Sequence, residues 1–362
     1  LVQLRETTDP NLLYTNYFYR SSTNLMMLES LKKVVAKSQT FVSLKKDDVV
    51  VDIGSNDCSM LSFFPNHTNR IGIEPATNID WTDTDKTIQI INDFFPSLKL
   101  EKYTNKKKVS IFTSCAMFYD LEDPNSFVKA IKDNLDQNGV WCIQLSYVLL
   151  MIKNLNFYDI CHEHLEYYSL NSLKFLMEKN GLEIVHAETN DVNGGSLLVF
   201  IKHLNLKNQK TNELKKLILL EEKMNLTSPE IYKKFFLEMK ELSLKVNNYL
   251  ENEIQNNRLV IGLGASTKGN ILLQFFKINK DRIPYISEKQ KMKVGLKTLG
   301  TDIELISEEK ARSLKPSCML MLPWYFKKEI LEREHEYLQQ GGSILIPMPY
   351  VHVVDKNGEK RI

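Results

Sequence analysis

A β-branched run that ends in a glycine turn constrains the fold of this chain more than any other feature. Residues 47–61 read DDVVVDIGSNDCSML, a pattern typical of a buried parallel strand that turns at Gly54 into a helix. Further strands are predicted at 70–75, 109–114 and 139–146, with a helix between the last two. Because strands alternate with helices, we expect a parallel α/β sheet with right-handed crossovers.

The end of this half departs from the alternation. Residues 170–181 are expected to form a helix, with Asn171 as its cap and Gly181 at its end. Two strands follow around Asn193-Gly194, a dipeptide typical of hairpin turns. A parallel sheet that is closed by an antiparallel hairpin is the outline of the class I methyltransferases, although an outline alone does not establish a function.

The second half of the chain begins with a charged, amphipathic stretch. Its apolar positions predict a helical connector that Pro229 splits in two. A second strand–glycine turn–helix pattern then predicts a smaller Rossmann-like domain of four or five parallel strands. We therefore expect four parts: an N-terminal helical segment at 1–45, a methyltransferase domain at 46–206, the connector at 207–257, and the Rossmann-like domain at 258–362.

The overall charge gives no reason to expect a nucleic acid or an anionic membrane as partner. The chain has 47 basic and 45 acidic residues and a net charge of +2, which favours neither nucleic acid nor an anionic membrane as partner. Its apolar runs are too short to span a bilayer, and no signal peptide is recognised, so we expect a cytoplasmic protein. The five cysteines are scattered, which favours reduced thiols over a disulfide framework.

Acidic residues recur where successive predicted strands end. Asp52 or Asp57 could meet the ammonium group of an amino-acid tail, and Glu74 could accept both hydrogen bonds of a ribose diol. Asp93 and Phe94 suit the amino group and the face of an adenine. Each residue taken alone also suits a helix cap or a strand-end charge, but their order predicts S-adenosylmethionine. The expected cofactor-binding residues are Asp52, Gly54, Asn56, Asp57, Glu74, Asp93, Phe94 and Ser114.

Two histidines flank a glutamate in DICHEHLEYYSL, residues 159–170. Three interpretations are open for His162, Glu163 and His164: a zinc site, histidines packed beside the following helix, or an acid–base pair. No cluster of cysteines or carboxylates accompanies them, which argues against zinc. Acid–base work is favoured because the imidazole pKa lies nearest neutrality, and Glu163 could orient an imidazolium.

Two glycine-containing segments complete the candidate site. NGGS suits a hairpin and also permits close approach of a ligand to the backbone. In IGLGASTKGN the glycine spacing differs from the dinucleotide fingerprint, but polar residues at a helix start could hold a phosphate. The predicted substrate-binding residues are Asn193, Gly194, Gly195, Ser196, Ser266, Thr267 and Lys268.

These motifs resemble the S-adenosylmethionine-dependent sugar C-methyltransferases that act on nucleotide-linked deoxysugars. The matching text spans nearly the whole chain: LVQL, DPNLLYTNYFYRSS, VDIGSND, GIEP, DICHEHLEYYSL, NGGS, GLGASTKGN, and LPWYFKKEI with GGSILIPMP. The resemblance implies an N-terminal zinc-binding domain, a central methyltransferase domain and a Rossmann-like C-terminal domain. The family's paired zinc cysteines precede the segment that resembles LVQL, so we expect no zinc here unless an N-terminal domain is missing.

The resemblance also implies catalytic roles. His164 is the expected base, Glu163 is expected beside the sugar, and His162 or nearby tyrosines are expected to stabilise an enolate. Two residues depart from the family pattern: Cys161 replaces a tyrosine, and Tyr119 replaces a histidine. Both departures bear on which sugar is bound and on the proton path. The predicted catalytic residues are His162, Glu163, His164, Tyr119, Tyr17 and Tyr19.

Other functions remain open at this point. The chain could methylate an oxygen or nitrogen of a saccharide, or it could be an NAD-dependent oxidoreductase that uses IGLGAST. A binding protein with a degenerate methyltransferase domain is a further alternative, because Cys58 lies in the cofactor loop. The expected partner is a nucleotide sugar, and the chain is expected to be a monomer or a dimer.

Overall fold

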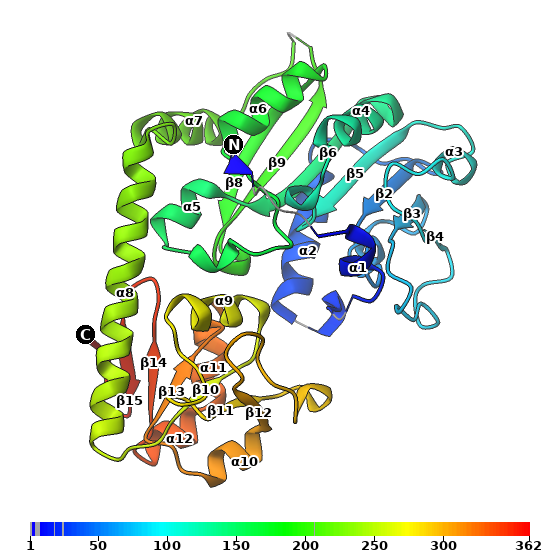
Figure 1. The fold of residues 1–362 in the computed structure, drawn as a ribbon. Coiled ribbons are helices and arrows are strands. Elements are labelled where there is room, and N and C mark those ends of the chain that lie inside the picture. The colour runs from blue at the N-terminus through cyan, green and yellow to red at the C-terminus, as the bar shows by residue number, and fades with distance from the viewer. Residues whose placement is uncertain (1, 4–7, 18, 24, 206) are drawn as a thin grey trace. The chain divides into compact units, whose positions relative to one another are not determined.

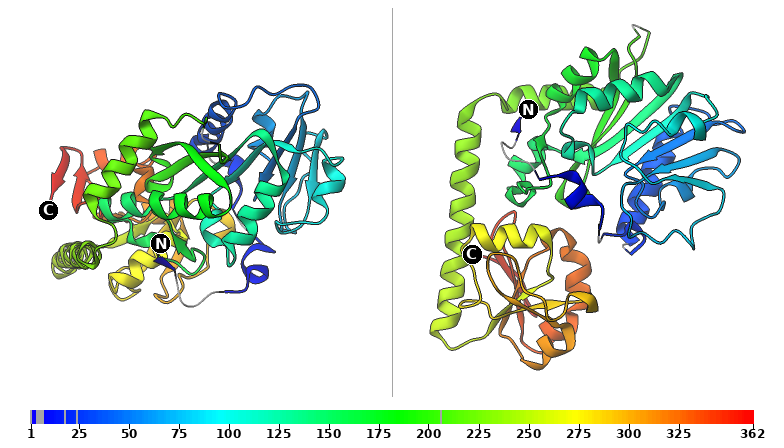
Figure 2. Two further views of the ribbon diagram at one scale, coloured as in Figure 1. Left: turned by 90° about the horizontal axis from the view of Figure 1, so that it is seen from above. Right: turned by 45° about the vertical axis from the view of Figure 1, so that its right-hand side comes forward.

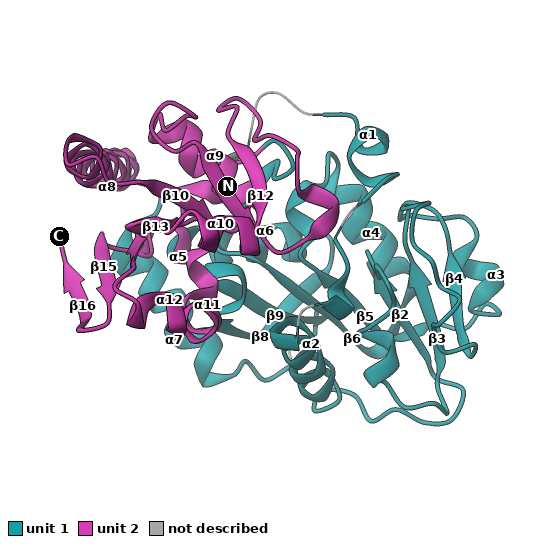
Figure 3. Cartoon of the chain, turned by 90° about the horizontal axis from the view of Figure 1, so that it is seen from below, with its two compact units in different colours: residues 1–149, 162–226 teal, residues 150–161, 227–362 magenta. Residues whose placement is uncertain are grey.

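The chain divides into two compact units, each built from two stretches of the sequence. The computed structural model describes residues 2–3, 8–17, 19–23, 25–205 and 207–362. Unit 1 comprises residues 1–149 and 162–226, and unit 2 comprises residues 150–161 and 227–362 (Figure 3). Residues 150–161, which we call the inserted segment, thus belong to unit 2 although they lie within the sequence of unit 1.

Unit 1 contains a seven-stranded sheet in the order β4-β3-β2-β5-β6-β9-β8. Its strands are β2 (Val49–Ile53), β3 (Asn69–Ile73), β4 (Ile88–Ile91), β5 (Val109–Cys115), β6 (Leu135–Ser146), β8 (Leu182–Asn190) and β9 (Ser196–His203). The strands β4, β3, β2, β5 and β6 run parallel to one another, and β9 is antiparallel to both β6 and β8. The predicted parallel sheet with a closing hairpin is therefore confirmed (Figure 1).

Short helices flank this sheet (Figure 2). They are α1 (Pro10–Tyr14), α2 (Leu25–Ser38), α3 (Leu100–Tyr103), α4 (Pro124–Asn134), α6 (Leu170–Lys179) and α7 (Asn212–Met224), and β1 (Val2–Gln3) pairs with β7 (Glu166–Tyr167). The helix α5 (Val148–Lys153) begins in unit 1 and continues into the inserted segment. The prediction that Asn171 caps α6 is wrong. Ser169 is the cap: its hydroxyl accepts from Ser172 N, and the Ser172 hydroxyl interacts in return with Ser169.

The helix predicted directly after Gly54 is absent. Residues 54–68 are all described, and they contain only the 3-10 turn η2 (Leu61–Phe63). Asn56 and Cys58 have φ angles of 50° and 62°, which no α-helix can accommodate. The Asp57 carboxylate accepts hydrogen bonds from the backbone of Ser59, so a local side-chain bond replaces the helical one.

One face of the unit 1 sheet packs against α2. Leu31, Val34 and Val35 of this helix are at most 5 % exposed and belong to one buried cluster with Val50 and Ile111 of the sheet. Burying an aliphatic side chain of this size stabilises the fold by about 1.5–3 kcal/mol. The cluster fixes the strands whose carboxyl ends carry the predicted cofactor residues.

Unit 2 contains a second seven-stranded sheet in the order β12-β11-β10-β13-β14-β15-β16. Its strands are β10 (Val260–Leu263), β11 (Tyr285–Glu288), β12 (Glu304–Ser307), β13 (Cys318–Met321), β14 (Ser343–Ile346), β15 (His352–Asp355) and β16 (Gly358–Arg361). The strands β12, β11, β10, β13 and β14 run parallel, in agreement with the prediction of four or five parallel strands. The strands β15 and β16 form an antiparallel extension that was not predicted.

The helices of unit 2 include a long amphipathic one. They are α8 (Pro229–Gln255), α9 (Thr267–Phe275), α10 (Glu308–Ser313), α11 (Lys327–Arg333) and α12 (His335–Gln339), with short 3-10 turns η4 (Phe157–Asp159), η6 (Lys291–Lys293) and η7 (Trp324–Phe326). α8 begins at Pro229, as the split of the predicted connector implied, and Ser228 caps it. In the described parts of the chain, no helix is long and apolar enough to cross a membrane.

Candidate functional site

The first turn of unit 1 is tied to the neighbouring strand. Gly54, with a φ of 71°, donates its N–H to the carbonyl of Ile73 at 2.9 Å. Glu74 follows β3, and its two carboxylate oxygens accept from Asn56 N at 2.8 Å and from Ala76 N at 2.9 Å. Burial raises the pKa of Glu74 although these hydrogen bonds lower it. The strand-end acid therefore lies at the carboxyl edge of the sheet, where parallel sheets bind ligands.

A second acid lies inside β2. Asp52 is 3 % exposed, and Thr113 donates its hydroxyl to Asp52 Oδ1 at 2.6 Å. Burial raises the pKa of Asp52 to about 7, and the nearby Glu74 adds to this rise. A cation bound at this edge would favour the ionised form. Ser114 on β5 is buried, and its hydroxyl accepts from Trp141 Nε1 at 3.2 Å.

The N-terminal segment binds the predicted cofactor loop. Asn56 accepts from Ser21 N at 3.1 Å and donates to the carbonyl of Tyr19 at 3.1 Å. Asp57 accepts from Ser22 N at 2.8 Å. The side chains of Asn56 and Asp57 therefore fasten residues 19–22 to the edge of the sheet, and the aromatic side chain of Tyr19 is 41 % exposed.

The adenine-binding candidates follow β4. Asp93 N donates to the carbonyl of Glu74 at 3.2 Å, which joins the ends of two neighbouring strands. The Asp93 carboxylate accepts from the Ser97 hydroxyl at 2.9 Å and pairs with Lys99 at 3.1 Å. The Phe94 side chain is 37 % exposed and thus retains an accessible aromatic face.

The HEH motif contacts the turn η3 (Phe118–Asp120). His164 is buried, and its ring centroid lies 4.2 Å from that of Tyr119. His162 Nε2 lies 4.0 Å from Glu163 Oε1, and its side chain is 59 % exposed. The predicted base is thus enclosed and faces a phenol ring, whereas the other histidine faces solvent.

Two tyrosines and an aspartate interact electrostatically with Glu163. The rings of Tyr14 and Tyr17 lie 5.9 Å apart, and the Asp120 carboxyl interacts with both Tyr14 and Glu163. Burial, reinforced by Glu163, raises the pKa of Asp120 well above its usual range and also raises the pKa of Tyr17. The Tyr17 phenol can therefore donate a hydrogen bond, and the protonated form of Asp120 is favoured relative to an exposed aspartate.

Tyr14 and Asp120 were not among the predicted site residues. The sequence offers one signal for Asp120: it directly follows Tyr119, and the two residues share the turn η3. Tyr119 interacts with His164 and Asp120 with Glu163, so two consecutive residues meet two consecutive residues of the HEH motif.

The hairpin of unit 1 needs its glycines for its backbone. Asn193, Gly194 and Gly195 have φ angles of 55°, 94° and 130°, a run that favours residues without a β-carbon. The Ser196 hydroxyl is buried and donates to the carbonyl of Val192 at 2.9 Å. The turn accounts for these residues, and their contact with substrate stays a prediction.

Unit 2 reproduces the turn of unit 1. Gly264 N donates to the carbonyl of Ser287 at 2.9 Å. Glu288, at the end of β11, accepts from Ala265 N at 3.0 Å and from Gln290 N at 2.7 Å. Glu288 therefore fastens the loop that leads into α9.

The predicted phosphate-binding residues have partners within unit 2. The Ser266 hydroxyl caps α9 by accepting from the backbone of its third residue at 3.0 Å, and Thr267 is the first residue of this helix. Lys268 Nζ lies 2.6 Å from Asp159 Oδ1 and 4.9 Å from the ring centroid of Tyr158. The predicted substrate residues thus divide between the units, with 193–196 in unit 1 and 266–268 in unit 2.

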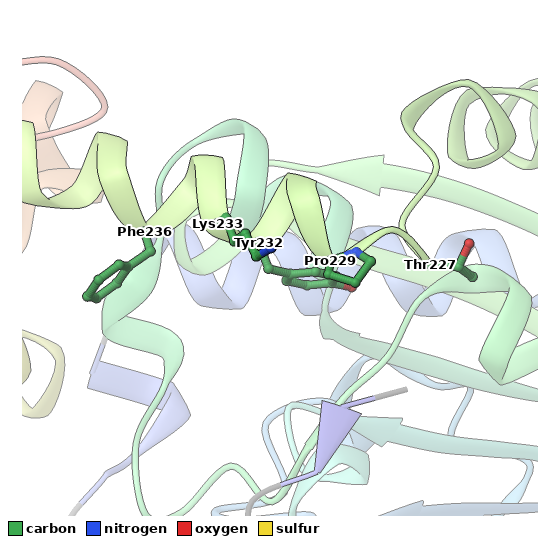
Figure 4. Close-up of a pocket in the computed structure, with 5 residues that line it drawn as sticks. All are labelled: Thr227, Pro229, Tyr232, Lys233 and Phe236. Atoms are coloured by element: carbon green, nitrogen blue, oxygen red, sulfur yellow. The ribbon is translucent and has the colours of Figure 1, made fainter.

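A pocket of about 530 Å³ opens beside the start of α8 (Figure 4). Thr227, Pro229, Tyr232, Lys233 and Phe236 line it, and none of them is a predicted site residue. Over the described ranges, no three histidine, cysteine or acidic side chains are grouped so that they could hold a metal ion. All five cysteines are free thiols.

Two family models match successive parts of the chain. Residues 27–187 match a model described as a methyltransferase domain, and residues 191–349 match one described as the C-methyltransferase C-terminal domain. A curated relative, the C-methyltransferase NovU of Streptomyces niveus, is 26% identical over 98% of this chain and 85% of its own length.

Solved structures of methyltransferases resemble about half of the chain. One is an S-adenosylmethionine-dependent methyltransferase of Clostridium acetobutylicum, with 10% identity, a TM-score of 0.39, and 49% of this chain and 92% of that chain covered. Another is the magnesium protoporphyrin IX methyltransferase of Synechocystis PCC 6803 with bound SAM, with 9% identity, a TM-score of 0.38, and 49% and 79% covered.

Proposed function

We propose that this chain, which belongs to the S-adenosylmethionine-dependent C-methyltransferases, methylates a carbon atom of a nucleotide-linked keto-deoxysugar. The observation that carries the proposal is the group of side chains around the HEH motif. It combines a buried imidazole, His164, with Tyr17, a phenol that can donate a hydrogen bond, and with Asp120, a carboxyl whose pKa is raised by burial. A carbon next to a keto group needs both: a base for its proton and donors for the oxygen of the resulting enolate.

The substrate class rests on sequence resemblance. The relative NovU is named a C-methyltransferase, which supports a carbon as the methylated atom. The nucleotide-linked deoxysugar follows from the motif text shared with the sugar enzymes. We expect the nucleotide to bind near residues 266–268, where α9 begins.

Residues at the carboxyl edge of the unit 1 sheet suit S-adenosylmethionine. Asp52 is a buried carboxylate with a raised pKa, so the protein leaves room there for a compensating positive charge. Glu74 and Asp93 end neighbouring strands, and Phe94 presents an exposed ring. When bound, S-adenosylmethionine supplies a methyl group that its sulfonium already activates.

The chain's own residues handle one proton and one developing charge. The keto group acidifies the hydrogen on the adjacent sugar carbon, and His164 accepts that proton. The electron pair moves onto the keto oxygen, where His162 or a neighbouring tyrosine donates a hydrogen bond. Enclosure of His164 against Tyr119 excludes water from the base and fixes its ring.

Deuterium exchange and product mass test the proposal. In deuterated buffer without cofactor, the protein should exchange the hydrogen of the sugar carbon in a nucleotide-linked 4-keto-deoxysugar. With S-adenosylmethionine, the product should gain one methylene in mass. Methylation without any exchange into the carbon would instead indicate an oxygen or nitrogen acceptor. Calorimetric titration with NAD tests the oxidoreductase alternative, which predicts NAD binding and no affinity for S-adenosylmethionine.

Replacement of the base gives a sharper test. His164→Ala should lower turnover by about 10²- to 10⁴-fold, while the affinity for S-adenosylmethionine stays unchanged. His162→Ala serves for comparison, because the two histidines differ in burial, and it should cost less, since a neighbouring tyrosine can also donate to the enolate oxygen. Near-wild-type turnover in His164→Ala would overturn the assignment of the base.

A further inference from the structure

We propose that the Asp159–Lys268 ion pair positions the catalytic loop. In this view the pair holds the end of the inserted segment, and the chain continues from there directly into the HEH motif. The inference deepens the proposed function and rests on it, since it takes residues 162–164 as the loop that carries the base. Neither residue is proposed to touch the reacting atoms, so both are positioning residues.

The ion pair is short and enclosed. Lys268 Nζ and Asp159 Oδ1 lie 2.6 Å apart, and their side chains are 19 % and 3 % exposed. The Lys268 ammonium also lies 4.9 Å from the ring centroid of Tyr158 and 5.5 Å from that of Tyr325, which are favourable cation–π distances. A buried pair of this kind gives a definite geometry, and loss of one partner leaves an uncompensated charge.

Aromatic contacts hold the rest of the turn η4. The ring of Phe157 lies 4.8 Å from that of Phe275 in α9, and the ring of Tyr158 lies 6.3 Å from that of Trp324. Phe157 and Tyr158 are at most 2 % exposed. All three residues of η4 are therefore fixed by side chains that come more than a hundred positions later in the chain.

Chain continuity links this anchor to the HEH motif. Only Ile160 and Cys161 separate Asp159 from His162, so a movement of Asp159 is passed on along the backbone. Cys161 N donates to the carbonyl of Asp159 at 3.1 Å, which closes the connection into a tight turn with little slack. A shift of about 1 Å in a catalytic group can cost on the order of 100-fold in rate.

Two single substitutions test the ion pair. Lys268→Met keeps the length of the side chain and its contacts with the aromatic rings but removes the charge, and Asp159→Asn removes the other charge. We expect each to lower kcat by about 10- to 100-fold, with the Kd of S-adenosylmethionine within about twofold of wild type. Lys268→Arg retains the pair and should restore most of kcat.

A second ion pair in unit 2, in which the acid is buried and the arginine is 41 % exposed, supplies a control. Arg312 pairs with Glu334 at 2.9 Å, and the Glu334 side chain is 1 % exposed. Arg312→Met should lower stability as Lys268→Met does and leave kcat unchanged. Unchanged kcat in folded Lys268→Met would overturn the proposal. So would a rise in KM for the nucleotide sugar with kcat intact, because that result would make Lys268 a phosphate ligand.

Hydrogen exchange tests the positioning role without any acceptor. Amides of residues 160–166 should exchange faster in Lys268→Met than in wild type, and those of Arg312→Met should not. Equal exchange in both variants would refute the inference even if the sugar is methylated. If the wild type methylates no nucleotide sugar, the proposed function fails, but the exchange result still decides the role of the pair. Where a single variant does not fold, the Asp159→Asn/Lys268→Met double variant removes the pair without leaving a buried charge.

Discussion

The two sheets of this molecule present the same turn at the same edge with different side chains around it. In unit 1, Glu74 accepts hydrogen bonds from Asn56 N and Ala76 N. In unit 2, Glu288 accepts in the same way from Ala265 N and Gln290 N. In both units the acid ends the second strand of a parallel pair and fastens the turn that follows the first strand.

The differences lie in what accompanies the turn. β2 carries the buried Asp52 two residues before Gly54, whereas β10 carries Gly262 at the equivalent position. A β-carbon at Gly262 would lie only 2.6 Å from the side chain of Ile286. Unit 2 continues into the helix α9, with Lys268 in its first turn, whereas unit 1 has no helix there. The two turns thus share their backbone hydrogen bonds but differ in the side chains beside them, a buried aspartate in unit 1 and the Asp159–Lys268 ion pair in unit 2, so we expect them to bind different ligands.

The largest expected effect follows from Asp52. Because its pKa is raised from 3.8 to about 7 in the folded chain, the unfolded chain ionises first, and the stability of unit 1 should fall as the pH rises from about 4 to about 7. Asp52→Asn should remove that fall. It should raise the free energy of unfolding at pH 8 by up to about 4 kcal/mol, at about 1.4 kcal/mol per pKa unit.

Urea unfolding of the cofactor-free protein at several pH values measures this effect. Unit 2 has Gly262 at the equivalent place and supplies the internal control, since its transition should not change. If Asp52→Asn and wild type show the same pH slope for unit 1, Asp52 is ionised in the folded protein, and this distinction between the units is lost.

A reciprocal pair of substitutions separates the two edges. Glu74→Gln should weaken S-adenosylmethionine binding by about 100-fold, since it removes a charged acceptor and leaves backbone donors poorly paired. Glu288→Gln should leave that affinity unchanged and raise the KM of the nucleotide sugar. Calorimetry and steady-state kinetics measure both. Equal losses of cofactor affinity in the two variants would show that the edges do not bind different ligands.

The smallest expected effect concerns the helix that only unit 2 has. Ser266→Ala removes the cap of α9 and should lower the free energy of unfolding of unit 2 by about 1 kcal/mol. Ser55→Ala, in the corresponding turn of unit 1, removes no helix cap and should cost less. Thermal unfolding compares them, and a larger loss in Ser55→Ala would contradict the difference drawn between the turns.

The strands of both sheets could be predicted where β-branched residues end at a glycine, as at Gly54 and Gly264. The missing helix after Gly54 was signalled in principle by the Asn56-Asp57 pair, whose side chains compete with backbone bonds, but the glycine turn suggested the commoner outcome. The short strand β4 and the extension β15–β16 were missed because brief or exposed strands lack a clear period.

The sequence allowed the residues of the candidate site to be named, but it did not reveal which of them contact one another. Glu74 could be placed at a strand end because it follows an apolar run, whereas Asp93 was placed only by its order after Glu74, since β4 was not predicted. Asp120 was missed because its role depends on the approach of Tyr14, a contact over a hundred positions long. The inserted segment was missed for the same reason: nothing local in the sequence of Phe157 shows that its partner is Phe275.

Residues 150–161 belong to unit 2 although they precede most of it in the sequence. This placement affects the order in which the chain can fold during synthesis. Domains generally fold as units, the N-terminal one first, while the ribosome is still elongating the chain. Here the inserted segment leaves the ribosome with unit 1, but the rings that cover Phe157 and Tyr158 belong to Phe275 and Trp324. Until those residues are translated, the nascent chain exposes an aromatic segment immediately before its HEH motif. The proposed anchor of the motif can therefore form only after Lys268 has been translated.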